Sequence, residues 1–295
     1  GGFRLQKICR AGRLGPPFNY RLLGAARRVA APCGAPMDIV CRVKPQNRQL
    51  TFSRFGFILG MPDFNQSIHK LEDLSMCGFT GFTTRSAPPD QDVLKAMGDA
   101  IRHRGPDDEG YYTDERCGIA HRRLSIMDLS SNGHQPMHSP DGRYVIAYNG
   151  ETYNFQQLRA ELAAAGHSFH TTCDTEVVLH GYMEWGAEVT KKLRGMFAFV
   201  IWDKEKGELY GARDPFGIKP FYYAAMGDLF FFGSECKSFL PHPGFRKELN
   251  PQALKFYLTF QYSALDESFF KGVFRLLPGH QLFWKDGAVE LSAYH

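Results

Sequence analysis

Apolar residues recur along the chain with two spacings, and the alternation between these spacings predicts a mixed fold. Short apolar runs typical of strands lie at residues 78–82, 118–126 and 144–148. Residues 93–101 instead carry apolar side chains at i, i+3, i+4, i+7 and i+8, the spacing of one face of an amphipathic helix. Those positions are held by Val93, Ala96, Met97, Ala100 and Ile101.

More helices and hairpins follow in the second half of the chain. We expect helices at about 154–165, 174–185 and 251–260. We expect hairpins that pair 197–202 with 208–212, 219–224 with 229–233, and two last strands around the turn at Asp286-Gly287. Because helices alternate with antiparallel hairpins, the pattern predicts an α+β fold rather than a doubly wound parallel sheet.

Charge is distributed unevenly and divides the chain at Met76. Residues 1–75 hold 12 Lys and Arg against four Asp and Glu, whereas the remainder holds 23 against 27. The formal net charge of +4 is therefore an average, and residues 76–295 lack the basic excess that would indicate nucleic-acid binding. The longest apolar run, from Met196 to Trp202, is too short to span a bilayer, so we expect no membrane segment.

Residues 1–75 lack the periodicity of a folded domain. Proline and glycine interrupt them repeatedly, and the first serine is Ser53, which is unlike a Ser-rich transit peptide. They also lack the apolar core of a secretory signal. We interpret this basic segment as a disordered leader or as upstream sequence read in frame, and residues 76–295 as one folded domain.

Seven cysteines are scattered along the chain, and none of them forms a C-x-x-C pair. This pattern fits neither a disulfide framework nor a zinc site and favours a cytoplasmic protein without a metal. Metal-ligand spacing is also missing among His103, His121, His134 and His180.

Met76-Cys77 has the form of an initiator methionine followed by a small residue. Removal of Met76 would leave Cys77 with a free α-amino group, whose pKa of about 7.7–8.0 lets it accept the thiol proton near neutral pH. With Met76 attached, the nitrogen of Cys77 is a peptide amide and cannot act as a base. We therefore expect catalysis only from a chain that begins at Cys77, and favour translation from Met76 over cleavage of a leader.

Downstream motifs give this cysteine a context. In order they are Arg102-His103-Arg104-Gly105-Pro106-Asp107, His121-Arg122-Arg123-Leu124-Ser125-Ile126, Gly133-His134-Gln135-Pro136, Tyr148-Asn149-Gly150-Glu151, Asp174-Thr175-Glu176 and Ala212-Arg213-Asp214-Pro215-Phe216-Gly217-Ile218-Lys219-Pro220. In this order and spacing, residues 76–295 closely resemble the glutaminase half of glutamine-dependent asparagine synthetase, a class II glutamine amidotransferase. The resemblance implies the N-terminal-nucleophile hydrolase fold, a four-layer αββα sandwich of two antiparallel sheets between helices.

The resemblance also implies the catalytic residues. Cys77 would attack the side-chain amide carbon of glutamine and form a γ-glutamyl thioester. The Asn149 amide and the Gly150 backbone N–H would stabilise the tetrahedral oxyanion. Taken alone, Asn149-Gly150 is also a common turn dipeptide, but the neighbouring motifs favour the catalytic interpretation.

Binding of free glutamine requires partners for its two charged α-groups. The resemblance assigns the α-carboxylate to Arg123, whose guanidinium offers a bidentate fork. It assigns the α-ammonium to Asp174 and Glu151, although Asp174 would also suit a helix N-cap. Pocket-shaping positions are implied at Leu124, Ile126 and Met127.

Other charged residues in these motifs have structural interpretations. We expect Arg102, Arg104 and Asp107 to support the loop around the nucleophile. We expect Arg213 and Asp214 to form an ion pair at the end of a strand.

The implied reaction is hydrolysis of glutamine to glutamate and ammonia, without a cofactor in this domain. The sequence contains neither an S-G-G-x-D-S pyrophosphate loop nor a G-x-x-x-x-G-K-S/T loop. We therefore expect the half that uses ATP and magnesium to amidate aspartate to lie beyond residue 295 or in a separate chain, and a homodimer is a further possible assembly. Two alternatives stay open: an amidotransferase for another acceptor, or a catalytically silent glutamine-binding or dimerisation module in which the leader blocks Cys77.

Overall fold

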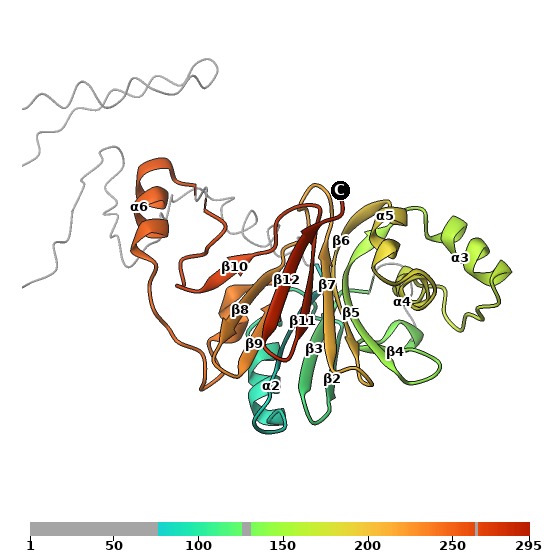
Figure 1. The fold of residues 1–295 in the computed structure, drawn as a ribbon, viewed down its shortest axis with the longest axis horizontal. Coiled ribbons are helices and arrows are strands. Elements are labelled where there is room, and N and C mark those ends of the chain that lie inside the picture. Colours follow the sequence, from blue (N-terminus) through green and yellow to red (C-terminus); the bar gives the residue numbers. More distant parts are fainter. Residues whose placement is uncertain (1–75, 126–130, 263–264) are drawn as a thin grey trace, which may run out of the picture. The chain divides into compact units, whose positions relative to one another are not determined.

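Two antiparallel six-stranded sheets dominate the fold (Figure 1). The structure is a computed structural model that describes residues 76–125, 131–262 and 265–295. Predictions made for residues 1–75, and for Ile126 and Met127, lie outside the described residues.

The first sheet has the strand order β10-β8-β9-β1-β3-β2, and the second has the order β12-β11-β7-β6-β5-β4. The first comprises β1 (Gly78–Thr83), β2 (Asp108–Thr113), β3 (Cys117–Arg123), β8 (Tyr222–Met226), β9 (Leu229–Gly233) and β10 (Val273–Arg275). The second comprises β4 (Met137–His138), β5 (Tyr144–Thr152), β6 (Gly195–Asp203), β7 (Glu208–Arg213), β11 (His280–Lys285) and β12 (Ala288–Ala293).

Helices cover the outer faces of both sheets. These helices are α2 (Gln91–Asp99), α3 (Phe155–Ala164), α4 (Asp174–Trp185) and α5 (Val189–Lys192), whereas α6 (Pro251–Phe260) lies to one side. Short 3-10 turns lie at Ser131–Gly133, Gly186–Glu188 and Cys236–Phe239. Helix α2 lies against the first sheet, while α3, α4 and α5 lie beside the second (Figure 1).

Alternation of side chains along the strands explains the layers. On β5, Val145 and Ala147 belong to the core between the sheets, whereas Ile146 and Tyr148 pack with residues of α3 and α4. On the other side of the molecule, Met97 of α2 packs with apolar residues of the first sheet. Three apolar layers therefore separate helix, sheet, sheet and helix, and the predicted α+β four-layer sandwich is confirmed.

Strand β1 occupies the middle of the first sheet, paired with β3 on one side and β9 on the other. All six of its residues are buried. Cys77 directly precedes this strand, so the predicted nucleophile is anchored to one of the most enclosed segments of the fold.

The structure differs from the predicted elements in a helix face, in a strand end and in three additional strands. The buried face of α2 is formed by Leu94, Met97 and Gly98, whereas Ala96 is exposed, so the predicted face was rotated by about one residue. Strand β5 runs on to Thr152, where the pattern predicted an end at 148. Strands β2, β4 and β10 were missed because they are short, polar or interrupted by glycine.

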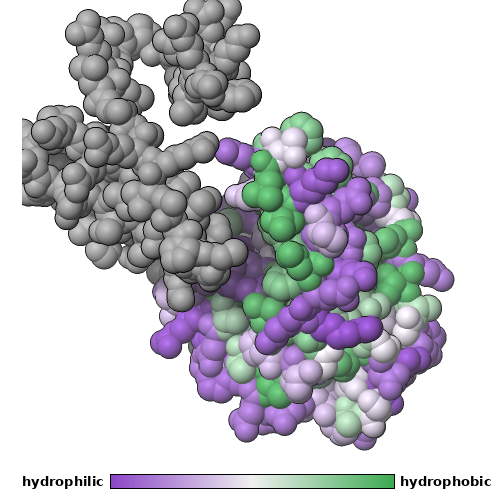
Figure 2. Space-filling view, turned by 90° about the vertical axis from the view of Figure 1, so that its left-hand side faces the viewer, coloured by the Kyte–Doolittle hydropathy of each residue, from purple (hydrophilic) through white to green (hydrophobic). Residues whose placement is uncertain are grey.

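Helix α6 has the predicted bounds but packs little against the rest of the domain. The Asn250 side chain caps it by accepting the N–H groups of Gln252 and Ala253, and Ala253 is its buried residue. Leu258 is 72% exposed. Figure 2 views the molecule from the α6 side and shows hydrophobic patches among hydrophilic surface. No helix in the described ranges is both long enough and apolar enough to cross a membrane.

Candidate active site

Cys77 lies at the start of β1, next to the space between the sheets. Phe79, two residues further on, packs in the inter-sheet core, and the alternation along a strand directs Cys77 to the same face. The Cys77 Sγ accepts the Leu124 backbone N–H at 3.3 Å and donates to the Leu124 carbonyl at 3.4 Å. Leu124 directly follows β3, so pairing of β1 with β3 brings the two residues together.

Burial raises the pKa of the Cys77 thiol above its ordinary value. The Leu124 contact and the positive charges of Arg123 and Lys219 act in the opposite direction, whereas the negative charge of Asp174 adds to the rise. Both of these Sγ contacts are to backbone groups of Leu124, which are not bases. Formation of the thiolate therefore requires a base that this arrangement does not yet supply.

Asn149 and Gly150 lie in the middle of a strand, and the turn interpretation of this dipeptide is wrong. They pair with Ala198 and Phe197 of β6. Asn149 is 1% exposed, and its Nδ2 has no hydrogen-bond partner among the described residues. An amide donor left unpaired in the interior is costly and therefore suits a site that awaits an acceptor.

Gly150 is required by the packing around it. A Cβ at this position would lie 2.4 Å from the Met196 carbonyl oxygen and 2.8 Å from the Phe197 Cα. A larger residue would push β5 away from β6 and move Asn149 with it. The glycine thus preserves the position of the neighbouring amide, while a role for the Gly150 N–H stays a prediction.

Asp174 is the first residue of α4, and its carboxylate points back to β5. Its Oδ2 accepts the Thr152 backbone N–H at 2.8 Å and the Tyr148 hydroxyl at 3.1 Å. Cys173 occupies the N-cap position, so the N-cap interpretation of Asp174 is wrong by one residue. Burial raises the pKa of Asp174, which means that a cationic partner would be favourable there.

Arg123 ends β3 with its side chain buried. A Cβ on Gly133 would lie 2.2 Å from the Arg123 Nη2, so the glycine leaves room for the guanidinium. The effect of Arg123 on the thiol pKa places its charge near Cys77. Cys77, Arg123, Leu124 and Asp174 therefore converge from β1, β3 and α4.

Arg104 connects the nucleophile to a small ionic cluster. Its Nε donates to the Cys77 carbonyl at 3.0 Å, and its Nη1 contacts Glu235 at 3.0 Å. Asp107 accepts the Ser125 backbone N–H at 2.8 Å. The expected support of the nucleophile loop is thus confirmed for Arg104 and Asp107.

Arg213 and Asp214 each bind the backbone instead of forming the predicted ion pair. Arg213 donates to the carbonyls of Gly217, Lys219 and Leu276, at 2.6–2.7 Å. Asp214 is fully buried and accepts backbone N–H groups at 3.0 Å from Phe216, Ile218 and Lys219. The prediction failed because the two side chains meet backbone groups of the turn before they meet each other.

Lys219 is a site residue that the sequence analysis did not identify. The pattern placed it in a strand, but β8 begins only at Tyr222. Its side chain is buried and faces the amino end of Cys77, where its Nζ lies 3.3 Å from the Met76 Sδ. Glu151, a half-buried residue of β5, raises the pKa of Lys219 and so lies within electrostatic reach. The position of Lys219 inside the Arg213–Lys219 motif was the sequence signal that could have pointed to it.

The histidines have structural contacts. His121 of β3 bonds the Tyr148 carbonyl of β5 through Nε2 at 3.1 Å, and desolvation lowers its pKa to about 4. His134 contacts Asp108 at 2.8 Å. Within the described ranges, no group of three or more His, Cys, Asp or Glu residues could hold a metal ion.

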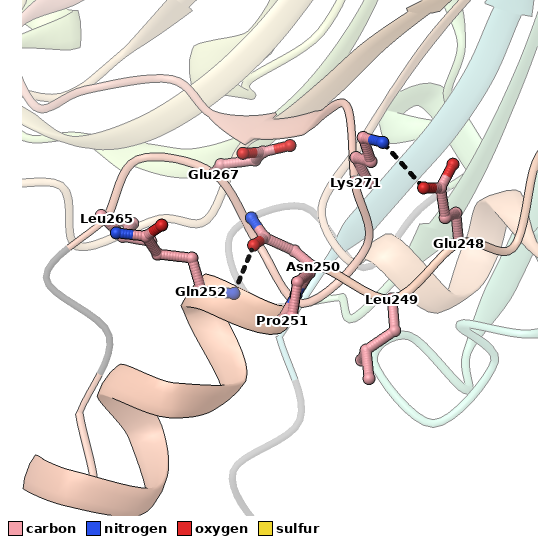
Figure 3. Close-up of a pocket in the computed structure, with 8 residues that line it drawn as sticks. All are labelled: Glu248, Leu249, Asn250, Pro251, Gln252, Leu265, Glu267 and Lys271. Carbon is pink, nitrogen blue, oxygen red and sulfur yellow. Dashed lines mark hydrogen bonds and ion pairs between the residues drawn. The ribbon is translucent and has the colours of Figure 1, made fainter.

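A cavity of about 540 Å³ lies beside the start of α6, away from these residues (Figure 3). Two of its charged side chains, Lys271 and Glu248, are paired with each other at 2.7 Å. Asn250 is engaged in capping the helix. None of the predicted site residues lines this cavity, so we assign it no part in the chemistry of Cys77.

Residues 76–295 are similar to known proteins of one family. The family model for a glutamine amidotransferase domain matches residues 76–295. Glutamine-hydrolysing asparagine synthetase 1 of Bacillus subtilis is 42% identical over 224 residues, which cover 74% of this chain and 35% of the relative. Asparagine synthetase 3 of the same organism is 38% identical over 218 residues, which cover 72% of this chain and 35% of that relative. The chain spans about a third of the length of these relatives.

A solved structure shares the fold at lower identity. Glutamine phosphoribosylpyrophosphate amidotransferase from B. subtilis aligns with a TM-score of 0.54 and 20% identity, covering 74% of this chain and 49% of that one. The family match and the two-sheet fold lead to the same conclusion. The chain belongs to the glutamine amidotransferase domain family.

Proposed function

We propose that residues 76–295 hydrolyse glutamine to glutamate and ammonia, with Cys77 as the nucleophile once its α-amino group is free. One observation carries the proposal: a buried Asn149 amide that has no hydrogen-bond partner among the described residues, on the inter-sheet face that Cys77 also faces. The match of this region to a glutamine amidotransferase domain supports the choice of substrate.

In the first step, the α-amine of Cys77 takes the thiol proton and Sγ attacks the side-chain amide carbon of glutamine. The C–S bond forms as the C=O π electrons move to oxygen. The Asn149 Nδ2 and the Gly150 N–H are assigned to this oxyanion, whose donors typically contribute about 10²–10³ in rate. A preorganised amide stabilises the charge without first breaking another bond.

In the second step, the C–N bond breaks and the α-ammonium returns its proton to the leaving nitrogen, which departs as ammonia. Water then attacks the γ-glutamyl thioester with the α-amine as the base, and the C–S bond breaks. The products are glutamate and regenerated Cys77. One amine thus acts alternately as base and acid.

Recognition of the substrate is assigned to charged residues around this centre. Arg123 would pair with the α-carboxylate, and Asp174 with the α-ammonium, assisted by Glu151. A buried carboxylate without a cation is disfavoured, so bound glutamine would offset the desolvation of Asp174. Leu124, Ile126 and Met127 are assigned to the pocket wall.

Within a longer protein or assembly, the ammonia would serve ATP-dependent synthesis of asparagine from aspartate. The relatives named as glutamine-hydrolysing asparagine synthetases support this wider role. The partner would be a synthetase domain, in the same chain or in another, that binds ATP and magnesium. A cytoplasmic location and a homodimer belong to the same proposal.

Expression from Met76 and from Gly1 tests the proposal. We expect glutaminase activity from the first form after removal of Met76, and none from an intact long form, because only a free α-amine can accept the thiol proton. Release of glutamate is measured on protein whose first residue is confirmed by mass spectrometry.

Two variants of the Cys77-start form serve as matched controls. Cys77→Ala abolishes glutamate release, whereas Cys236→Ala, at another half-buried thiol, retains it. Equal activity of the intact long form, or activity in Cys77→Ala, would show the mechanism to be wrong.

A further inference from the structure

Lys219 carries a buried positive charge at the amino end of the nucleophile. Its side chain is 6% exposed, and its Nζ donates to the Met76 Sδ at 3.3 Å. A thioether sulfur is a weak acceptor and neutralises no charge. Among the described residues, no carboxylate forms a salt bridge with this ammonium.

The turn before Lys219 holds this residue rigidly. The Asp214 carboxylate accepts the Lys219 backbone N–H at 3.0 Å, and the Arg213 Nε donates to the Lys219 carbonyl at 2.7 Å. Asp214 is itself tied to β6, because its N–H donates to the Phe197 carbonyl at 2.8 Å. Both backbone groups of Lys219 are thus fixed by side chains of one motif, the buried Asp214 and the half-buried Arg213.

An unpaired ammonium in the interior is expensive, and such a group is retained where it stabilises a charge that forms during function. Met76 is the residue that must leave before Cys77 has a free amine. Its departure would leave the Lys219 ammonium about one side-chain length from that amine. A nearby positive charge disfavours a protonated amine and favours a thiolate.

We propose that Lys219 is an electrostatic positioning residue, which keeps the α-amine of Cys77 in its free-base form and stabilises the thiolate. This inference rests on the proposed glutaminase function. It adds the Lys219 charge to the free α-amine of Cys77 as a requirement for activity. The Arg213–Lys219 turn would exist to hold this charge in place.

The charges around Lys219 and Cys77 are consistent with this role. Desolvation lowers the pKa of Lys219, while Glu151 of β5 and Cys77 raise it and Arg104 lowers it. The Lys219 charge in turn lowers the pKa of the Cys77 thiol, in the same direction as Arg123 and against Asp174. Removal of the charge therefore moves the amine and the thiol pKa upward together.

The pH dependence of Cys77 alkylation tests the proposal without glutamine. The protein is the Cys77-start domain, which contains both sheets and their cores and forms one compact unit. Iodoacetamide modification of the Cys77 peptide is followed by mass spectrometry from pH 5 to 10. We expect Lys219→Met to move the inflection upward by about one pH unit, which slows alkylation about tenfold below it.

Matched variants separate charge from structure. Lys219→Arg keeps the charge, so its inflection should stay close to that of the unmodified protein. Lys191→Met, at an exposed lysine of α5, should leave the inflection unchanged. Lys219→Gln replaces Lys219→Met if the latter loses its cooperative melting transition. An unmoved inflection in a folded neutral variant overturns the proposal.

Glutaminase kinetics provide the second readout. Lys219→Met should lower kcat about tenfold near pH 7, with recovery at higher pH and little change in KM. A raised KM with an unmoved pH profile would make Lys219 a glutamine-binding residue and overturn the proposal. If alkylation shifts as expected but no form releases glutamate, the glutaminase proposal fails while the role of Lys219 stands.

Discussion

At the scale of single residues, the side-chain amide of Asn149 is notable because it is buried and its Nδ2 has no hydrogen-bond partner among the described residues. By contrast, Asn154 bonds the Lys192 carbonyl and the Arg194 N–H. Asn154 thus stabilises the native fold, whereas we propose that Asn149 is available to a ligand. Replacement of Asn149 should therefore affect activity, whereas replacement of Asn154 should affect stability.

Replacement of Asn149 by Ala should lower kcat for glutamine about 10²–10³-fold, because one donor to the oxyanion is lost. Since the Nδ2 makes no hydrogen bond to any described residue, the free energy of unfolding should change by less than about 1 kcal/mol. Steady-state kinetics and urea denaturation measure the two effects.

Asn154→Ala is the matched control, with the opposite expectation: activity is retained, and about 1–2 kcal/mol of stability is lost with the two hydrogen bonds. A fall in kcat of less than threefold in Asn149→Ala would exclude the oxyanion role.

Residue types were predictable from the motifs, but their surroundings were not. The unpaired state of Asn149 depends on which groups the second sheet brings near it, and these lie far away in sequence. Lys219 was missed for a similar reason, because its neighbour Met76 is 143 positions away.

At the scale of elements, helix α2 depends on a single capping side chain. The Asp90 carboxylate accepts the N–H groups of Asp92 and Val93 at 2.8 and 3.1 Å. Through Leu94 and Met97 the helix covers the outer face of the first sheet. The cap at the start of α2 should therefore contribute to the stability of the first sheet, which Cys77 directly precedes.

Asp90→Ala should destabilise the domain by about 1 kcal/mol, because two N–H groups at the helix start lose their acceptor. Urea denaturation of the Cys77-start domain measures the change. Asp92→Ala removes an acidic side chain from the same turn without removing the cap. It should lower the free energy of unfolding by only about 0.3 kcal/mol. Equal losses would show that charge, and not capping, stabilises α2.

Strong periodicity located most elements, and their ends were harder to predict. Helix α4 has the predicted bounds because glycine stops it at 186 and a polar segment precedes it. Strand β5 was predicted too short, since Asn149 and Gly150 are typical of turns. Pairing with the long strand β6 overrides that local preference.

At the scale of the whole molecule, His121 joins the two sheets. It belongs to the first sheet and bonds the Tyr148 carbonyl in the second, while its Nδ1 is buried without a partner among the described residues. Desolvation lowers its pKa to about 4, so the imidazole is neutral in the folded state near pH 7. Protonation would place an uncompensated charge between the sheets.

This histidine should make the stability of the domain dependent on pH. Its pKa is about 6.5 in the unfolded chain, so the unfolded state binds more protons between pH 6.5 and 4, and stability falls as the pH falls. At pH 5 the expected loss is about 2 kcal/mol relative to pH 7. Urea denaturation across this range measures it.

His121→Gln should flatten this dependence, whereas His295→Gln, at an exposed histidine, should leave it unchanged. A slope that is identical in His121→Gln and in the unmodified protein would assign the acid sensitivity to another group.

The sandwich was expected from the resemblance of the motifs to a known family. Periodicity alone supported an α+β class, because it does not determine which strands share a sheet. The order β10-β8-β9-β1-β3-β2 joins strands from both ends of the domain, and such pairing depends on long-range packing.

The central place of β1 has a consequence for the form that we propose to be active, which begins at Cys77. Chain ends usually fray independently of the rest of a domain. Here the first strand is fully buried and hydrogen-bonded to a neighbour on each side, so its amides can exchange with solvent only when the sheet itself opens. In a chain that begins at Cys77, loss of order at the amino terminus and global unfolding are then one cooperative event, and the proposed nucleophile stays ordered for as long as the core does.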